Sequence, residues 1–183
     1  MPTPAKTSRA AVIAIACDLV AAHGAEALTV AAVAQRAGVR APSLYKHFAD
    51  RSALLKAVEI AVLDELEAAL RAGTAGSTPQ QRLVAMAAAY RTFARAQPKR
   101  YGIIYSRNAA DDAELAAACR RLAMPLFEEL AAAGVAPAEV HSLARTVVAF
   151  LHGFVAIEIV GAFRLGGDLD RDFAEGLARI LPG

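Results

Sequence analysis

The sequence has few of the residues that build metal sites or disulfide frameworks. Its only cysteines, Cys17 and Cys119, lie far apart and form no CxxC pair. Two such thiols among apolar residues are typical of reduced core positions, and they do not supply a zinc ligand set. Paired Glu-x-x-His motifs and HExxH are also absent, and the four histidines are scattered. We therefore expect no metal and no cofactor.

Aromatic residues make up only 6% of the sequence and β-branched residues are sparse, whereas roughly a quarter of the residues are alanine. Alanine is the best helix former, so the composition predicts an all-α protein and argues against an enzyme built on a sheet. With 56% hydrophobic residues, the chain is too apolar for a disordered protein. Its 183 residues are enough to bury a core without disulfides.

We expect neither a targeting signal nor a membrane span. Residues 1–10 are polar, and the apolar run behind them is interrupted by Asp18, which is unlike a signal peptide. Residues 147–163 are nearly continuously apolar, but they include His152 and Glu158, and about 17 residues is the lower limit for a span. We interpret this segment as a buried helix of a cytoplasmic protein.

Positive charge is concentrated near the N-terminus. Residues 1–56 carry seven lysines and arginines against three acidic residues, a net charge of +4, whereas the rest of the chain has a net charge of −2. A basic head on a mildly acidic body is the distribution of an anion-binding protein. A local excess of four charges also arises by chance, so the charge distribution alone does not establish an anion-binding site, and the sequence motifs are needed to distinguish the two interpretations.

Glycine, proline and capping residues divide the chain into helices. Thr7 or Ser8 is a cap for the first helix, Thr29 is a cap for the second, and Thr78 and Gln81 have the spacing of a capping box. A polar loop is expected at 73–79 and a short aromatic segment at 101–105. The expected helices cover about residues 9–22, 30–37, 42–48, 51–71, 79–97, 112–133, 137–165 and 169–181.

The segment of residues 29–48, TVAAVAQRAGVRAPSLYKHF, carries the most information about function. Two short helices joined by a tight turn are typical of a helix-turn-helix, whose second helix lies in the major groove of DNA. Gly38 can adopt the positive φ that the turn needs. The residues expected to fill the interior are Val33, Val39, Leu44 and Phe48. The opposite face offers hydrogen-bond donors and an aromatic ring from Arg40, Ser43, Tyr45, Lys46 and His47.

At these residues the chain resembles the TetR (tetracycline-repressor) family of bacterial transcription regulators. The match reads AxxAGVxxxxLYxHF, preceded by LTV, and the resemblance extends over residues 8–60. A later segment, residues 150–154 with Glu158, is similar to the WHG subgroup of that family, with Leu151 in place of the tryptophan. The resemblance implies a homodimeric, all-helical regulator. Its N-terminal helices would bind DNA, and a larger helical body would bind a small molecule and dimerise.

Carried onto this sequence, the resemblance implies a DNA-binding domain at residues 1–52 and an effector-binding and dimerisation domain at residues 53–183. Thr29 would reach a phosphate at the start of its helix, and Arg51 would reach a flanking phosphate. Arg40 stands where the family often has a serine or threonine cap, and because arginine cannot accept the capping bonds, its role stays open. The recognition surface would comprise Arg40, Ser43, Tyr45, Lys46 and His47.

Simpler roles are open for the same residues. Tyr45 and His47 also fit a packing role, and Lys46 and Arg51 also fit ordinary solvated charges. In the body, a stripe of methionine and aromatic residues is either a core or the lining of an effector cavity. The candidates for contact with an effector are Met86, Tyr90, Phe93, Tyr101, Ile104, Tyr105, Phe127, Phe150 and Phe154.

The long helix expected after Pro137 is apolar nearly all round, so it must be buried on more than one side. The body can cover one side, and a second subunit is the natural cover for the other. Glu158 on this helix needs either a helix edge or a cation such as Arg164 or an arginine of a second subunit. The candidate interface residues are Leu143, Val147, Leu151, Ile159, Phe173 and Leu177.

A two-fold dimer would present its recognition helices to major grooves about 34–36 Å apart, which predicts a palindromic operator. The main hypothesis is a repressor that a small molecule releases from this operator. One alternative is a DNA-binding dimer whose body takes no small ligand. A helical-bundle enzyme is the weakest alternative, because no nucleophile–base pair, phosphate loop or metal set stands out.

Overall fold

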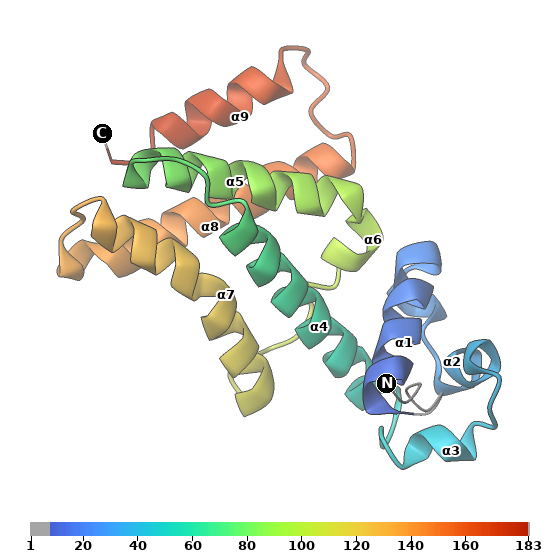
Figure 1. Ribbon diagram of the computed structural model, residues 1–183. Helices are drawn as coiled ribbons and strands as arrows, with labels where there is room; N and C mark the ends of the chain where they lie inside the picture. Colours follow the sequence, from blue (N-terminus) through green and yellow to red (C-terminus); the bar gives the residue numbers. More distant parts are fainter. Residues whose placement is uncertain (1–7, 183) are drawn as a thin grey trace. The chain divides into compact units, whose positions relative to one another are not determined.

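The computed structural model describes residues 8–182, and every regular element in that range is a helix (Figure 1). The all-α architecture predicted from composition is confirmed. The elements are α1 (Arg9–His23), the 3-10 helix η1 (Ala25–Ala27), α2 (Val30–Ala37), α3 (Pro42–Tyr45), α4 (Arg51–Ala72), α5 (Pro79–Ala96), α6 (Pro98–Tyr101), α7 (Ala113–Ala132), α8 (Pro137–Ile159) and α9 (Leu169–Ala178).

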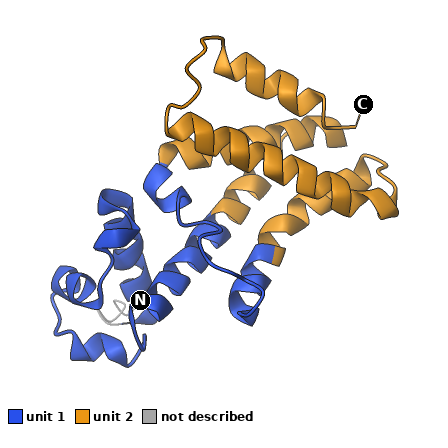
Figure 2. Cartoon of the chain, turned by 180° about the vertical axis from the view of Figure 1, so that it is seen from behind, with its two compact units in different colours: residues 1–65, 97–119 blue, residues 66–96, 120–183 orange. Residues whose placement is uncertain are grey.

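The chain forms two compact units (Figure 2). The first unit holds the residues up to Glu65 together with Gln97–Cys119, so the short helix α6 joins the N-terminal helices. The second unit holds Leu66–Ala96 and the residues from Arg120 onwards. The helices α4 and α7 each contribute residues to both units.

The first helix begins and ends where local signals place it. The Oγ of Ser8 accepts a hydrogen bond from the Ala11 amide at 3.2 Å, which caps α1. Thr7, the other expected cap, lies outside the described residues. Gly24 ends the helix with φ 83°, a conformation that a side chain would strain. The helix buries one stripe at positions spaced by three and four residues, formed by Val12, Ala16, Cys17, Leu19 and Val20.

The second unit is built around the pair α5 and α8, which pack against each other. The capping box predicted at the start of α5 is present: the Gln81 amide donates to Thr78 Oγ1 at 3.2 Å, and the Thr78 amide donates to Gln81 Oε1 at 3.3 Å. The reciprocal bonds satisfy two amides that no helical carbonyl can reach. The boundary of α5 therefore follows from its own sequence.

Helix α8 ends about six residues earlier than the sequence pattern predicts. The helix was expected to continue to Gly166 and Gly167, but it ends at Ile159. Gly161 adopts φ 65°, and the Ala162 amide donates to the Ile157 carbonyl at 3.1 Å, which closes the last turn. The missed signal is the glycine itself, because the apolar residues around it read as a continued helix.

Within its own chain, α8 is buried along one stripe: Val140, Ala144, Val147, Leu151 and Val155. Of the described helices, it is the one long and apolar enough to cross a membrane on length and composition alone. Core helices of soluble proteins meet the same test, so this is weak evidence for a membrane protein.

Candidate nucleic-acid interface

The helix-turn-helix predicted at residues 29–48 is present in the first unit. Thr29 Oγ1 accepts from the Ala32 amide at 3.0 Å and caps α2. Gly38 ends α2 in the left-handed conformation, with φ 68°, and the Val39 amide donates to the Ala34 carbonyl at 3.0 Å. This bond turns the chain within a few residues, so that α3 begins at Pro42.

The recognition helix is shorter than expected. We expected a helix from Pro42 to about Phe48, whereas α3 ends at Tyr45 and the following residues form a turn. The Phe48 amide still donates to the Leu44 carbonyl at 3.1 Å, so the chain completes one further helical bond. A helix this short depends on tertiary contacts for its stability, because a single turn does not recover the entropy of nucleation.

Three of the four apolar residues predicted to fill the interior of the motif are buried, whereas Val39, in the turn, is half-buried. Val33 is fully buried, and Leu44 and Phe48 are 1% and 3% exposed. The helices α1 and α2 pack against each other, and the Arg9 guanidinium lies 5.5 Å from the centroid of the Phe48 ring. Burial of these residues fixes which face of α3 is turned to solvent.

Of the five residues predicted for the recognition surface, three present their side chains to solvent. Arg40, Tyr45 and Lys46 are exposed, with Tyr45 54% exposed. Ser43 and His47 are half-buried. The Ser43 hydroxyl donates to the Arg40 carbonyl at 2.7 Å, and the His47 ring lies 6.4 Å from the Phe48 ring. Two cations and an exposed phenol are suited to contact phosphates and base edges.

Arg51 has a structural task at the start of α4. Its Nε donates to the Leu28 carbonyl and its Nη2 to the Ala25 carbonyl, both at 2.7 Å. These bonds attach the η1 segment to α4, just before the capping residue Thr29. The contact joins positions 23 residues apart, so no short-range pattern in the sequence indicates it. A phosphate contact of Arg51 stays a prediction.

Two further cations of the first unit hold α4 to the loop that follows α6 and to the first turn of α7. Lys56 Nζ lies 3.0 Å from Asp112 Oδ2 and 3.3 Å from Glu114 Oε2. The Arg107 Nη2 donates to Ser52 Oγ at 2.7 Å, beside the N-terminus of α4. No sequence pattern indicates a role for Arg107, because the two residues lie 55 positions apart.

The nine residues proposed for effector contact are divided between the units. Tyr101, Ile104 and Tyr105 lie in the first unit, and the other six lie in the second. Met86 lines a hollow of about 210 Å³ together with Arg71, Thr74, Pro125, Glu128 and Glu129. The remaining candidates of the second unit are Tyr90, Phe93, Phe127, Phe150 and Phe154, and none of them lines this hollow.

Phe150 and Phe154 belong to an aromatic cluster between α8 and α9. The ring of Phe173 lies 5.6 Å from that of Phe150 and 5.2 Å from that of Phe154. The Arg91 guanidinium lies 4.9 Å from the centroid of the Phe173 ring. A side chain at Gly176 would come within 2.7 Å of the Phe150 ring, so the close packing of α9 needs glycine there.

Glu158 is paired, as its position in an apolar run requires, but its partner is Arg91 rather than Arg164. The Arg91 Nε donates to Glu158 Oε2 at 2.8 Å, and its Nη2 donates to Glu158 Oε1 at 2.6 Å. Tyr90 Oη lies 3.5 Å from His152 Nδ1, and burial lowers the pKa of His152. Beside it, a methyl group on Gly153 would meet no atom within 4 Å.

The six residues proposed for the dimer interface differ in exposure. Val147, Leu151, Phe173 and Leu177 are buried in their own chain, whereas Leu143 and Ile159 are half-buried. Four further large apolar side chains reach solvent at the end of α8 and in the loop that follows: Ile157, Val160, Phe163 and Leu165. In the same unit, Val84 on α5 and Met124 on α7 are also exposed.

Two family models match the chain. The model described as bacterial regulatory proteins of the tetR family matches residues 12–58, which include α2, the turn and α3. The model described as a tetracyclin repressor-like C-terminal domain matches residues 83–180, more than half of the chain. The second match is compatible with the WHG-like pattern around His152.

Relatives and solved structures agree with these matches. The uncharacterized HTH-type transcriptional regulator Rv0681 of Mycobacterium tuberculosis is 32% identical over 183 residues, which cover 98% of this chain and 83% of that protein. A protein of unknown function from Rhodococcus sp. RHA1 has a TM-score of 0.82 at 24% identity, covering 94% and 92% of the two chains. A TetR variant from Acinetobacter baumannii AYE, in complex with minocycline, has a TM-score of 0.70 at 23% identity, covering 94% and 93%. The chain belongs to the TetR family of DNA-binding transcriptional regulators.

Proposed function

We propose that this regulator is a homodimeric repressor that binds a palindromic operator in the cytoplasm of a bacterial cell. In this proposal a small-molecule effector releases it from the operator, and the protein catalyses no reaction. Residues 1–52 bind DNA, and residues 53–183 bind the effector and dimerise. The family matches at residues 12–58 and 83–180 support this division.

The observation that carries the proposal is the solvent-facing side of the helix-turn-helix. Arg40, Tyr45 and Lys46 are all exposed there, and the buried Leu44 and Phe48 hold the opposite side against the first unit. Contacts of arginine and lysine with phosphates supply most of the affinity for DNA, and the side chains that reach base edges supply the choice of sequence.

Thr29 and Ser43 contribute short polar side chains to the same surface. Thr29 lies at the N-terminus of α2, where the amides and the helix dipole favour a phosphate oxygen. The hydroxyl of Ser43 already donates to the Arg40 carbonyl, so its oxygen can accept a hydrogen bond from a base. His47 is half-buried and completes the surface beside Lys46.

The dimer proposal rests on the apolar side chains that the single chain leaves in solvent. Val160 is 72% exposed and Leu165 is fully exposed. Ile157 in the last turn of α8 and Phe163 in the following loop are exposed as well. Exposed apolar side chains clustered at the end of one helix mark an interaction site more often than a free surface. A second copy that packs through α8 and α9 covers them and gives the two recognition helices a two-fold relationship.

The effector is proposed to bind in the second unit. The Acinetobacter baumannii TetR variant similar in fold was solved with minocycline, which makes a small ligand for this body the natural proposal. The open space beside Gly153 and the hollow next to Met86 are two places in this unit where the described side chains leave room.

A DNA-binding dimer without a small ligand is the second candidate function. The hollow beside Met86 is about 210 Å³, below the roughly 300 Å³ at which small-molecule sites usually begin. Phe150 and Phe154 pack against Phe173 rather than lining this hollow. In this alternative the body serves only for dimerisation and for binding a protein partner.

Binding to the DNA upstream of the gene, measured at two salt concentrations against scrambled DNA, tests the proposed function. We expect tight, sequence-dependent binding that weakens steeply with salt, and a footprint with two symmetric halves. An effector screen on that complex then separates the two candidates, because only the first predicts release. Equal affinity for scrambled DNA at both salt concentrations would contradict the proposal.

A further inference from the structure

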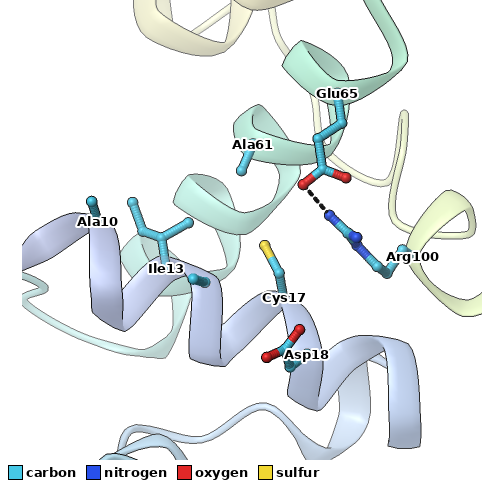
Figure 3. Close-up of a pocket in the computed structure, with 8 residues that line it drawn as sticks. Ala10, Ile13, Cys17, Asp18, Ala61, Glu65 and Arg100 are labelled. Carbon is cyan, nitrogen blue, oxygen red and sulfur yellow. Dashed lines mark hydrogen bonds and ion pairs between the residues drawn. The ribbon is translucent and has the colours of Figure 1, made fainter. Parts of the chain in front are cut away.

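A hollow of about 340 Å³ lies in the first unit, where α1, α4 and α6 meet (Figure 3). Small side chains leave this space open, because alanines stand where longer residues would close it. This volume falls within the range of small-molecule sites. The apolar part of the lining consists of Ala10, Ile13 and Ala14 from α1 and Ala61 from α4.

One end of the hollow carries charged groups from all three helices. Asp18 lies beside Cys17 on α1, Glu65 projects from α4, and Arg100 reaches Glu65 from α6 (Figure 3). The Arg100 Nη2 donates to Glu65 Oε1 at 2.5 Å, and its Nη1 donates to Gln97 Oε1 at 2.6 Å. The lining therefore holds two carboxylates against one guanidinium.

Asp18 decides the sign of the charge that the hollow accepts. Its carboxylate makes no hydrogen bond or ion pair with another residue of the range 8–182, whereas Glu65 is engaged with Arg100. Burial raises the pKa of the Cys17 thiol, so this group stays neutral at pH 7. The end of the hollow thus has a net charge of −1, and it favours a cation over an anion.

We propose that this hollow binds a small amphipathic organic cation. Its ammonium or amidinium group lies between Asp18 and Glu65, and its short apolar body lies along the alanines and Ile13. A neutral molecule of the same shape would gain no electrostatic attraction from the two carboxylates, so the charge of the lining favours a cation. A metal ion is a poorer occupant, because the described residues contain no group of three or more acidic, histidine or cysteine side chains placed to hold one.

At this site α6 is attached to α4 through the ion pair between Arg100 and Glu65. A bound cation can compete with Arg100 for the Glu65 carboxylate. The Arg100 Nε is buried without an acceptor among the described residues, and Arg100 reaches α4 through its ion pair with Glu65. Lys99 Nζ donates to the Ala22 carbonyl at the end of α1 at 2.5 Å. The occupant contacts α1, which packs against α2 of the helix-turn-helix. The proposal concerns a site separate from the body, and it holds whether or not the body takes an effector.

The test uses the full-length protein without DNA, so its outcome is independent of the proposed repressor function. Benzylamine, benzyl alcohol and benzoate have similar shapes and carry charges of +1, 0 and −1 at pH 7. Each is titrated against ¹⁵N-labelled protein while the amide shifts are followed. We expect saturable shifts with benzylamine centred on residues 10–18, 61–65 and 100, at least fivefold weaker binding of benzyl alcohol, and no saturable shift at these amides with benzoate.

Two variants locate the benzylamine site. Asp18→Asn removes the charge of an exposed side chain without changing its size, and we expect at least a fivefold loss of affinity. Ala61→Leu fills the hollow and should abolish the shifts, with circular dichroism as the check on folding. Glu26→Gln, an exposed acidic residue in η1 away from the hollow, is the control and should bind as the unmodified protein does. Unchanged affinity of Asp18→Asn, equal binding of benzoate, or benzylamine shifts confined to the second unit would each overturn the proposal.

Discussion

Arg91 and Glu158 form a two-point ion pair between α5 and α8, with nitrogen–oxygen distances of 2.8 and 2.6 Å. Both side chains are 10% exposed, and Arg91 Nη1 also lies 2.8 Å from Asp170 Oδ1 at the start of α9. The pair explains how an apolar helix tolerates a carboxylate near its end. It also places the guanidinium against the aromatic rings that join α8 to α9.

Breaking this pair should destabilise the second unit strongly. Glu158→Gln removes the buried partner of Arg91 and leaves the guanidinium with the exposed carboxylate of Asp170 as its nearest counter-charge. We expect the free energy of unfolding to fall by about 3 kcal/mol, because a buried charge then loses most of its compensation. Urea unfolding followed by circular dichroism measures the change. The double variant Arg91→Met with Glu158→Leu should recover part of the loss, since neither charge is then buried alone. A single variant as stable as the unmodified protein would contradict this account of the pair.

Two glycines should respond in opposite directions to alanine. Gly38 has φ 68°, so Gly38→Ala forces a side chain into the left-handed region and should cost about 1–2 kcal/mol. Gly153 lies inside α8, and a methyl group there meets no atom within 4 Å, so Gly153→Ala should stabilise by up to about 1 kcal/mol. Thermal unfolding of both variants measures the two changes in stability. The same sign for both changes would show that helix propensity and backbone strain do not determine these positions.

Glu59 makes stability depend on pH. The residue is 1% exposed, its Oε2 has no partner among the described residues, and burial raises the pKa of its carboxyl from 4.5 to about 7. The nearby Arg107 guanidinium and the Tyr105 amide oppose this rise of the pKa. Because the protonated form is favoured in the folded state, its stabilising contribution is full below about pH 4.5 and is lost as the pH rises to about 7.

The matched variant is Glu59→Gln, which keeps the size of the side chain and removes the titration. Relative to the unmodified protein, its free energy of unfolding should improve progressively between pH 4.5 and pH 7, by up to about 3 kcal/mol, and then level off. Urea unfolding at several pH values measures the difference. A difference that does not change over this range would mean that Glu59 titrates normally.

Thr29 and Ser8 allow a capping role to be separated from a DNA-contact role. Each side chain accepts a hydrogen bond from an amide three residues later, at 3.0 and 3.2 Å respectively. Replacing either with alanine should cost about 1 kcal/mol of stability. Only Thr29→Ala should also weaken DNA binding, because Ser8 is not part of the proposed recognition surface. Equal effects of both variants on DNA affinity would remove Thr29 from that surface.

Local signals in the sequence were sufficient for α2, the turn and the start of α3, but not for the end of α3. Thr29, Gly38 and Pro42 act on their own few neighbours, and α2 covers the residues 30–37 that these signals predict. The capping box at Thr78 is local in the same way. These elements were therefore predictable without knowledge of the rest of the chain.

Contacts between distant positions were not predictable from such signals. The bond from Arg51 to the Leu28 carbonyl and the pairing of Glu158 with Arg91 depend on how helices pack, and no spacing in the sequence indicates them. The predicted end of α8 was wrong for a related reason. Gly161 stands in an apolar run that continues past it, and the hydrophobic pattern outweighed the helix-ending signal.

The salt dependence of DNA binding tests the central claim most directly. Arg40→Ala with Lys46→Ala is compared with the unmodified protein and with Arg179→Ala, an exposed cation on the second unit. We expect the double variant to bind operator DNA more weakly and with a shallower salt slope, by about one unit for each phosphate interaction that the substitutions remove. Arg179→Ala should match the unmodified protein. An unchanged affinity and slope for the double variant would contradict the placement of the DNA-binding surface at α3 and the residues that flank it.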